Sequence, residues 1–313
     1  MAVSEAPART RAAAKAAHRA RRRRGSLTHP TRTAWAMVTP ALLFVAAFVL
    51  VPLVFAIYIS MTNWPLIGSY RFIGLGNYRA MFTDTAFGQS VLYTLLYTAI
   101  VTVPILLIGY AMAVVVRARR RGSTLLRTIF FLPYVIGLST LSFITVLEAQ
   151  PDSGAVNVVL KALGITDGST AWLVDAPLAT GLVSVLVVWG VSGLTMVLLL
   201  SGMQAIPRET YESAETDGAG WWQREWHITI PMMRRTIAMS LILSVIGSFL
   251  AFTQFFILTQ GGPGRQTTPV VMYIYQRAFV QLQVGAATAL SIALVIVVGL
   301  ISAAQFWLLR ERD

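Results

Sequence analysis

The sequence predicts an all-α integral membrane protein with six transmembrane helices. Only 12% of the 313 residues are charged and 56% are hydrophobic, whereas a soluble domain has about 25% charged residues. The mean hydropathy is +0.67. Six apolar stretches each reach the length of about 20 residues that a helix needs to cross the hydrocarbon core of a bilayer.

Each apolar stretch contains Gly or Pro, which membrane helices tolerate better than soluble ones do. The first follows a basic tail, as a signal peptide does. However, it is longer than the roughly 7–15 residues of a signal-peptide apolar core, and no small-residue cleavage site follows it, so we expect a retained helix. The six predicted spans are Ala34–Ile59, Val91–Val116, Ile129–Leu147, Leu178–Met203, Ile237–Leu258 and Val284–Leu309.

The distribution of basic residues predicts the orientation of the chain. Six spans place segments 1–33, 117–128, 204–236 and 310–313 on one side, where they hold 20 Lys and Arg against five on the other. Such an excess marks the cytoplasmic side. We therefore expect a basic, disordered cytoplasmic tail (1–33) near anionic lipid headgroups, a six-span transmembrane domain (34–309) with a cytoplasmic segment (204–236), and a short cytoplasmic tail (310–313). The simplest role of the first tail is to set this orientation.

Several function classes are disfavoured by residues that the sequence lacks. It has no cysteine for a disulfide, thiolate metal site or nucleophile, and His18, His29 and His227 lack metal-ligand spacing. A phosphate-binding P-loop is absent, since neither Lys15 nor Lys161 follows a glycine. The net charge of +12 lies beside apolar stretches and not on a groove-entering element, which argues against nucleic-acid binding. We expect no catalytic site, metal or cofactor.

The span cores contain no charged residue or histidine, and Glu148 lies at the outer end of the third. Ion-driven carriers usually need intramembrane carboxylates or histidines, so proton coupling is disfavoured, while sodium sites built from carbonyls and hydroxyls stay open. Most span hydroxyls are expected to bond between helices. Aromatic rings, hydroxyls and amides nevertheless suit an uncharged polyol or sugar. The predicted path residues are Ser139, Ser142, Trp189, Ser192, Thr253 and Gln254.

The polar segment between the fourth and fifth spans has the pattern of two short helices joined by a turn. Pro207 suits the first turn of a helix, which is expected to end near Thr216. The pair Asp217-Gly218 then breaks the helix, because Gly can take the left-handed conformation after its end. A second amphipathic stretch, Trp221–Ile230, carries tryptophans that suit the lipid headgroup layer. Taken separately, these features also fit an ordinary connecting loop.

As one string, these residues resemble the EAA motif of importer permeases, the membrane subunits of binding-protein-dependent ATP-binding-cassette transporters. Ser213 stands where a second Ala is usual, which is a small-for-small change. The resemblance implies a coupling helix that docks in a cleft of an ATPase subunit, where Glu212 pairs with a basic group and Gly218 permits close approach. The implied coupling residues are Glu212, Ser213, Ala214, Asp217, Gly218 and Ala219, with Ile230-Pro231 downstream.

Four longer strings extend the resemblance to sugar permeases of the maltose and glycerol-phosphate type. The resemblance implies the type I importer permease fold in its compact six-span form, in a bacterial cytoplasmic membrane. It also implies a second permease subunit, two ATPase subunits and an extracytoplasmic solute-binding protein. The strings are FIGLGNYRAMF at 72–82, LRTIFFLPYVIG at 126–137, LLSGMQAIPRETYESAETDGAG at 199–220 and ILTQGGPGRQTTPVVMYIY at 257–275.

Three alternatives stay open. A permease of the same type for glycerol phosphate or another organic solute would need a basic residue near an anionic substrate, and only loop residues such as Arg265 or Arg277 could serve. A self-contained, ion-driven secondary carrier predicts uptake by this chain alone. A purely structural scaffold would have no solute path. The Gly- and hydroxyl-bearing spans argue against a scaffold, although membrane interfaces between helices also use small residues.

Overall fold

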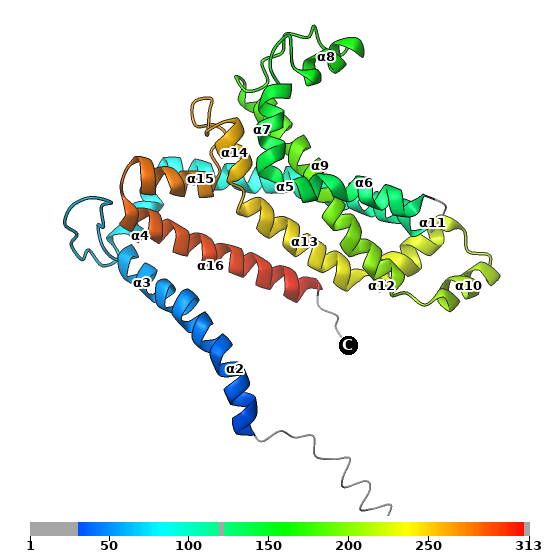
Figure 1. Cartoon of the computed structure of the whole chain (residues 1–313), viewed down its shortest axis with the longest axis horizontal. Helices are drawn as coiled ribbons and strands as arrows, with labels where there is room; N and C mark the ends of the chain where they lie inside the picture. The colour runs from blue at the N-terminus through cyan, green and yellow to red at the C-terminus, as the bar shows by residue number, and fades with distance from the viewer. Residues whose placement is uncertain (1–30, 119–121, 310–313) are drawn as a thin grey trace, which may run out of the picture. The chain divides into compact units, whose positions relative to one another are not determined.

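The computed structural model describes residues 31–118 and 122–309, and Figure 1 shows its helices. The chain divides into two units, and the boundary in the sequence falls between Tyr58 and Ile59. Within the described residues the elements are helices, with two isolated bridges and no named strand. This confirms the predicted all-α class. The C-terminal tail and all but the last three residues of the predicted basic tail lie outside the described residues.

The described part of the first unit is one long apolar helix. It comprises α2 (Thr31–Val45), the π-helical turn η1 (Ala46–Leu50) and the start of α3 (Val51–Ser60), which ends two residues inside the second unit. The stretch Trp35–Ser60 reaches a mean hydropathy of 2.9. It corresponds to the first predicted span.

Four further predicted spans are long helices of the second unit. Two of them begin at an aspartate cap: Asp84 accepts hydrogen bonds from the N–H groups of Ala86 (3.1 Å) and Phe87 (3.2 Å), and Asp175 accepts one from that of Leu178 (3.1 Å). Such a cap satisfies backbone donors that have no partner inside the helix. The helices are α5 (Thr85–Arg117), α9 (Ala176–Gln204), α13 (Arg234–Phe249) continued by α14 (Thr253–Leu258), and α16 (Val284–Leu309).

The third predicted span, Ile129–Leu147, is not one straight helix. Two helices, α6 (Ser123–Ile136) and α7 (Leu138–Glu148), meet there at 88°. Gly137 joins them with φ 85° and ψ 147°, a conformation that only glycine adopts readily. Pro133 lies one turn earlier and lacks the N–H that would continue the helical ladder. By length and composition the described chain has five helices that could cross a membrane, and six if this sharply bent pair forms one span.

Shorter helices lie at the ends of the long ones (Figure 1). They are α4 (Gly76–Thr83), α8 (Ala155–Ala162), α10 (Arg208–Thr216), α11 (Trp221–Arg224), η2 (Glu225–Thr229), α12 (Ile230–Met232), α15 (Val270–Tyr275) and η3 (Gln276–Val280). Some of them follow one another directly: α11, η2 and α12 form one continuous helical stretch, and η3 continues α15.

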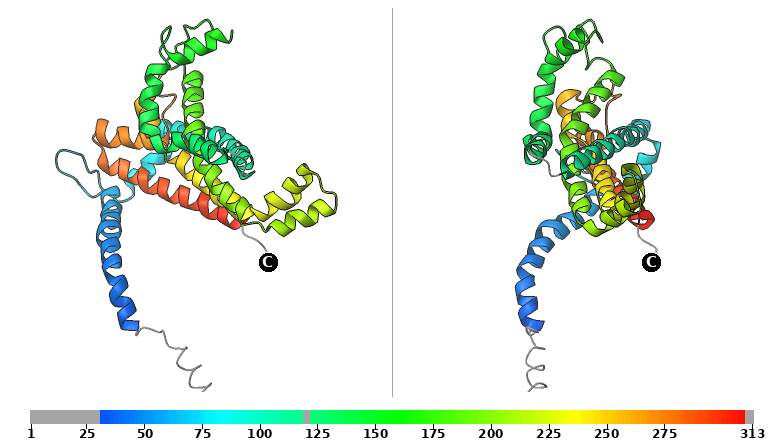
Figure 2. Two further views of the ribbon diagram at one scale, coloured as in Figure 1. Left: turned by 45° about the vertical axis from the view of Figure 1, so that its right-hand side comes forward. Right: turned by 90° about the vertical axis from the view of Figure 1, so that its right-hand side faces the viewer.

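The second unit is built around the long contact between α5 and α9. Helix α6 packs on α9, α13 packs on α5, and α16 packs on α13 (Figures 1 and 2). Buried clusters around Tyr97 and Phe255, around Met196 and Met233, and around Phe249 fill the spaces between them. Where these helices lie in a membrane, van der Waals contacts between such close-packed side chains, and not removal of apolar surface from water, hold the helices together.

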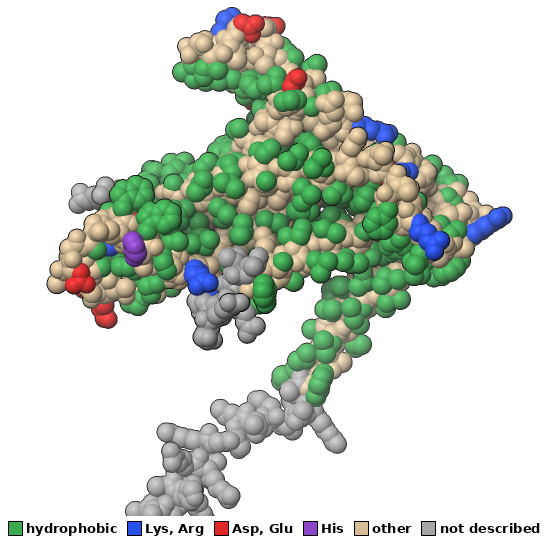
Figure 3. All heavy atoms as spheres, turned by 180° about the vertical axis from the view of Figure 1, so that it is seen from behind, with side chains coloured by type: hydrophobic (Ala, Val, Ile, Leu, Met, Phe, Trp, Pro, Cys, Tyr) green, Lys and Arg blue, Asp and Glu red, His purple; other side chains and the backbone are tan. Residues whose placement is uncertain are grey.

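The outward faces of the second unit are apolar. Figure 3 shows hydrophobic side chains over much of its surface, with charged side chains mostly near its ends. Large apolar side chains such as Val185 on α9 and Val295 on α16 are more than two-thirds exposed. Contiguous exposed apolar surface of this kind marks a membrane or partner interface.

Candidate functional site

The polar segment predicted as the site begins with α10. Pro207, with φ −58° and ψ 138°, directly precedes the first helical residue, Arg208, and so lies just outside the turn in which it was predicted. Glu209 occupies that first turn, where the helix dipole favours a negative charge. The helix ends at Thr216, as the sequence predicts.

Gly218 terminates α10 in the left-handed conformation, with φ 77°. The N–H of Ala219 donates to the carbonyl oxygen of Ala214 (2.9 Å), and the N–H of Gly218 donates to that of Glu215 (3.0 Å). These two bonds form a Schellman motif, which satisfies carbonyl groups at the end of a helix. The predicted Gly break is therefore confirmed as a defined turn.

A second helix follows the turn and runs from Trp221 to Met232 through α11, η2 and α12. The N–H of Gly220 donates to Gln223 Oε1 (2.8 Å) at its start. The side chains of Trp221, Trp222 and Trp226 are exposed, in agreement with the predicted amphipathic pattern. The π-helical turn in the middle is of a kind often found at functional sites.

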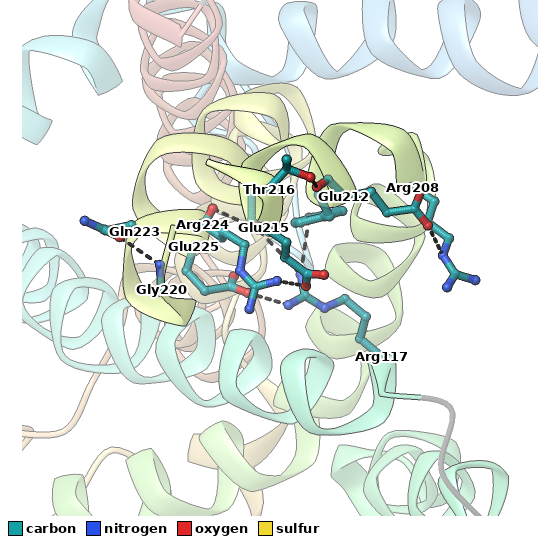
Figure 4. A network of polar contacts seen from close by, with 11 residues as sticks. Arg117, Arg208, Glu212, Glu215, Thr216, Gly220, Gln223, Arg224 and Glu225 are labelled. Carbon is teal, nitrogen blue, oxygen red and sulfur yellow. Dashed lines mark hydrogen bonds and ion pairs between the residues drawn. The ribbon is translucent and has the colours of Figure 1, made fainter. Parts of the chain in front are cut away.

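Beneath this second helix lies a buried carboxylate, that of Glu225, whose side chain is only 3% exposed. It pairs with Arg117 at the end of α5 and accepts a hydrogen bond from Tyr110 Oη (2.5 Å). Figure 4 shows Arg117 reaching from α5 toward this carboxylate. Sequence analysis did not select Glu225, although a lone acidic residue inside an amphipathic stretch was a usable signal.

Arg117 also joins the first helix of the segment to this buried pair. Its guanidinium carbon lies 5.5 Å from the ring centroid of Tyr211 on α10, and Nη1 donates to Tyr211 Oη (3.4 Å). Tyr211 Oη and Thr229 Oγ1 share a further hydrogen bond of 3.0 Å. We call Tyr110, Arg117, Tyr211, Glu225 and Thr229 the α5 cluster. It connects α5, α10 and η2 through polar contacts.

Two further carboxylates of the segment, Glu212 and Glu215, form ion pairs at the surface. Glu215 pairs with Arg224, and Glu212 pairs with Arg208 (2.8 Å). The Arg208 and Glu212 side chains are 91% and 57% exposed, and Figure 4 shows Arg208 directed away from the α5 cluster. Exposed pairs of this kind contribute at most about 1 kcal/mol. Glu212 is therefore accessible to an approaching partner.

The six predicted coupling residues lie together on this surface. Ala214 and Ala219 are half-buried, while the other four are exposed. Beside them is a recess of about 340 Å³, lined by Asp217, Gly218, Ala219, Gln223, His227 and Ile228. A hollow of about 460 Å³ lies on the side of Arg117, Tyr211 and Glu225. The geometry suits the docking of a protein surface. No group of His, Asp and Glu that could hold a metal ion occurs in residues 31–118 or 122–309.

The six predicted path residues lie on three helices that pack against one another: α7 (Ser139, Ser142), α9 (Trp189, Ser192) and α14 (Thr253, Gln254). The buried Ser142 and Ser192 hydroxyls donate to the carbonyl oxygens of Leu138 and Val188, each at 2.6 Å. Gln254 Nε2 donates to Tyr97 Oη (3.3 Å). The Trp189 side chain is 53% exposed.

A second polar cluster lies at the other end of α5. Asp84 pairs with Arg277 of η3 and accepts a hydrogen bond from Tyr273 Oη of α15. Burial alone would raise the Asp84 pKa, but the hydrogen bonds from Tyr273, Arg277 and the Phe87 amide lower it below its ordinary value of 3.8. Burial likewise opposes the charge of Arg277, yet its contact with Asp84 raises the Arg277 pKa.

Comparison with solved structures shows the fold. The chain superposes on one chain in the crystal structure of a bacterial ABC transporter involved in the import of the acidic polysaccharide alginate. The TM-score is 0.79 at 21% sequence identity, covering 89% of this chain and 95% of that chain. At this identity the similarity concerns the arrangement of helices alone.

Sequence comparison gives closer relatives. A probable ABC transporter permease of Pyrococcus horikoshii is 33% identical over 264 residues, covering 82% of this chain and 90% of the relative. The multiple sugar-binding transport system permease of Streptococcus mutans is 31% identical, with coverages of 89% and 96%. The lactose transport system permease of Rhizobium radiobacter is 32% identical, with coverages of 89% and 94%.

Residues 105–310 match the family described as the binding-protein-dependent transport system inner membrane component. The matched region includes both helices of the polar segment and its Gly turn. It also includes the broken α6–α7 pair and residues 105–117 of α5. The chain therefore belongs to the family of inner membrane components of binding-protein-dependent transport systems.

Proposed function

We propose that this chain is the membrane-spanning permease subunit of an ATP-driven bacterial carbohydrate importer. The observation that carries the proposal is the exposed α10–turn–α11 segment, with Glu212 accessible and Gly218 left-handed, in a chain of the binding-protein-dependent family. Relatives named for multiple sugars, starch degradation products and lactose support a carbohydrate substrate. The subunit provides half of the path and carries out no covalent chemistry.

The proposed assembly contains a second permease, two ATPase subunits and an extracytoplasmic solute-binding protein. The family description supports the binding protein, and one similar structure is a transporter in complex with a pentasaccharide-bound periplasmic protein. The second permease is either a different chain or a second copy. In this assembly residues 204–236 and both termini are cytoplasmic.

Labelling of single cysteines in the cysteine-free chain tests this orientation. We expect Thr216→Cys to be labelled from the cytoplasmic side and Ser169→Cys from the opposite side, and the reverse pattern would contradict the orientation.

In this mechanism the ATPase moves the polar segment, which changes the access of the path. Glu212 exchanges its exposed pair with Arg208 for a basic group of the ATPase, an exchange that loses at most about 1 kcal/mol. A Cβ at Gly218 would meet no atom within 4 Å in the isolated chain. The space beside it is therefore free for a close approach by the partner.

The proposed path is neutral, which favours an uncharged sugar over an organic phosphate. Arg277 is unsuited to an anionic substrate because Asp84 already neutralises it. Its remaining donors bond to Tyr273, Gln281 and Gln283, each at 2.9 Å. Arg265 is exposed beside a recess of about 320 Å³. Of the two loop residues considered, it is the one that could still bind an anionic substrate, as the organic-phosphate alternative requires.

The variants Glu212→Ala and Gly218→Val test the coupling role. A side chain at Gly218 costs about 1–2 kcal/mol in the left-handed conformation and fills the space for approach. We expect both variants to insert and to lose ATP-dependent sugar uptake, while ATP hydrolysis by the complex persists. Asp167→Ala lies in an exposed loop outside the polar segment. It serves as the control, and this variant should import normally. Normal import by both coupling variants would show that the segment is not the coupling element.

A further inference from the structure

Helix α5 is held at each end by a charged cluster that reaches another part of the second unit. Its last residue, Arg117, pairs with the buried Glu225 of the polar segment. The residue that caps its start, Asp84, pairs with Arg277. The helix between these clusters has 33 residues, which corresponds to a length of about 50 Å. One helix thus connects the polar segment with α15 and η3.

The pair at the end of α5 differs from the other ion pairs of the segment in its burial. Glu225 is 3% exposed, whereas Glu212 and Glu215 are each more than half exposed. Separating a buried pair leaves a charge without compensation, which is strongly unfavourable. Separating an exposed pair has little effect, because water replaces the partner. The contact between Arg117 and Glu225 is therefore the one that resists separation when the segment is displaced.

The directions of the contacts also fit a mechanical link. Tyr110 and Arg117 approach Glu225 from α5, one turn or more apart along that helix. Tyr211 brings α10 into the same cluster through Arg117 and Thr229. Both helices of the polar segment are thus fastened to the same end of α5. A push on α10 cannot move it independently of α5 without breaking charge-assisted bonds, which are stronger than neutral ones.

The opposite end of α5 is fastened to a different element. Asp84 contacts Arg277 and Tyr273, and Thr94 Oγ1 accepts a hydrogen bond from the N–H of Val270 (2.9 Å). These contacts bind the start of α5 to α15 and η3. Movement of α5 therefore displaces groups at both of its ends.

We propose that Arg117 and Glu225 are positioning residues that fasten the coupling segment to α5. Through this pair, displacement of the segment by the ATPase moves α5 as a rigid strut and shifts α15 and η3 at its far end. The inference rests on the proposed function, since it assumes that an ATPase moves the segment. It adds a specific transmitting contact that lies outside the six coupling residues.

The test compares Glu225→Gln and Arg117→Gln with Arg224→Gln in the complete complex. Arg224→Gln is the matched control, because it removes the exposed pair with Glu215 from the same segment. We expect the first two variants to assemble with the ATPase and to import about tenfold less sugar per ATP hydrolysed, within the usual range of coupling between sites. The control should keep the wild-type ratio. An unchanged ratio in Glu225→Gln and Arg117→Gln overturns the proposal.

A distance measurement decides the question even if a variant fails to assemble. The chain has no cysteine, so spin labels can be placed at Ala118→Cys and Met232→Cys, both exposed positions. In the wild-type background we expect one distance between the labels, unchanged between the nucleotide-free and vanadate-trapped complex. A change of this distance on trapping means that the segment moves without α5 and overturns the proposal. Failure of the wild-type complex to import sugar with ATP would instead refute the proposed function itself.

Discussion

At the scale of single residues, Asp84 shows how one side chain can serve two purposes. One carboxylate oxygen caps α5 through the N–H groups of Ala86 and Phe87. The other oxygen accepts hydrogen bonds from Tyr273 Oη and Arg277 Nη2. Because these donors favour the charged form, the Asp84 pKa in the folded protein lies below 3.8. The contribution of Asp84 to stability therefore depends on pH.

The comparison of wild type with Asp84→Asn tests this dependence. Asparagine keeps the cap but loses the charge, so at pH 7 we expect the variant to be less stable by about 2 kcal/mol. A group whose folded pKa is depressed contributes stability above its unfolded pKa and loses it as pH falls through the folded pKa. The advantage of wild type in thermal unfolding should thus shrink below about pH 4. An equal advantage at pH 7 and pH 3 would contradict the role of the charge.

At the scale of helices, close approach depends on small residues at defined positions. A Cβ at Gly193 of α9 would lie 2.2 Å from the carbonyl oxygen of Phe130 in α6. The Cβ is fixed rigidly to the backbone and the carbonyl oxygen is part of the backbone, so neither atom can rotate away. The contact between α6 and α9 holds one half of the broken pair against the centre of the second unit.

The variants Gly193→Ala and Gly181→Ala make a matched pair on the same helix. A Cβ at Gly181 meets nothing within 4 Å, so this change should be neutral or gain up to about 1 kcal/mol from helix propensity. Gly193→Ala should lose about 1–3 kcal/mol through overpacking. Thermal unfolding in detergent measures both. Equal melting temperatures would show that α6 and α9 do not need this close contact.

The sequence predicts these helices well where the signal is local. Apolar length identifies the spans, and the pair Asp217-Gly218 locates the turn that ends α10. It does not predict the bend at Gly137, because Gly and Pro are also tolerated in straight membrane helices. Glu225 could have been selected as a lone acidic residue in an amphipathic stretch, but its partner Arg117 is 108 residues away, and the pattern within one helix cannot reveal that contact.

At the scale of the whole molecule, the main question is where the energy for transport enters. The predicted span cores hold neutral side chains, the sequence contains no phosphate-binding P-loop motif, and the Arg208–Glu212 pair of the polar segment is exposed. The family assignment places the chain among inner membrane components of binding-protein-dependent systems. Its central property in our account is that transport energy enters from a separate ATPase through the segment.

Reconstitution into proteoliposomes tests this property most directly. Uptake of a radiolabelled sugar is measured for the complete complex with its binding protein and enclosed ATP, for the same complex without ATP, and for the purified chain alone. We predict that only the first preparation concentrates the sugar. Accumulation by the chain alone, driven by an ion gradient or without ATP, would contradict the account.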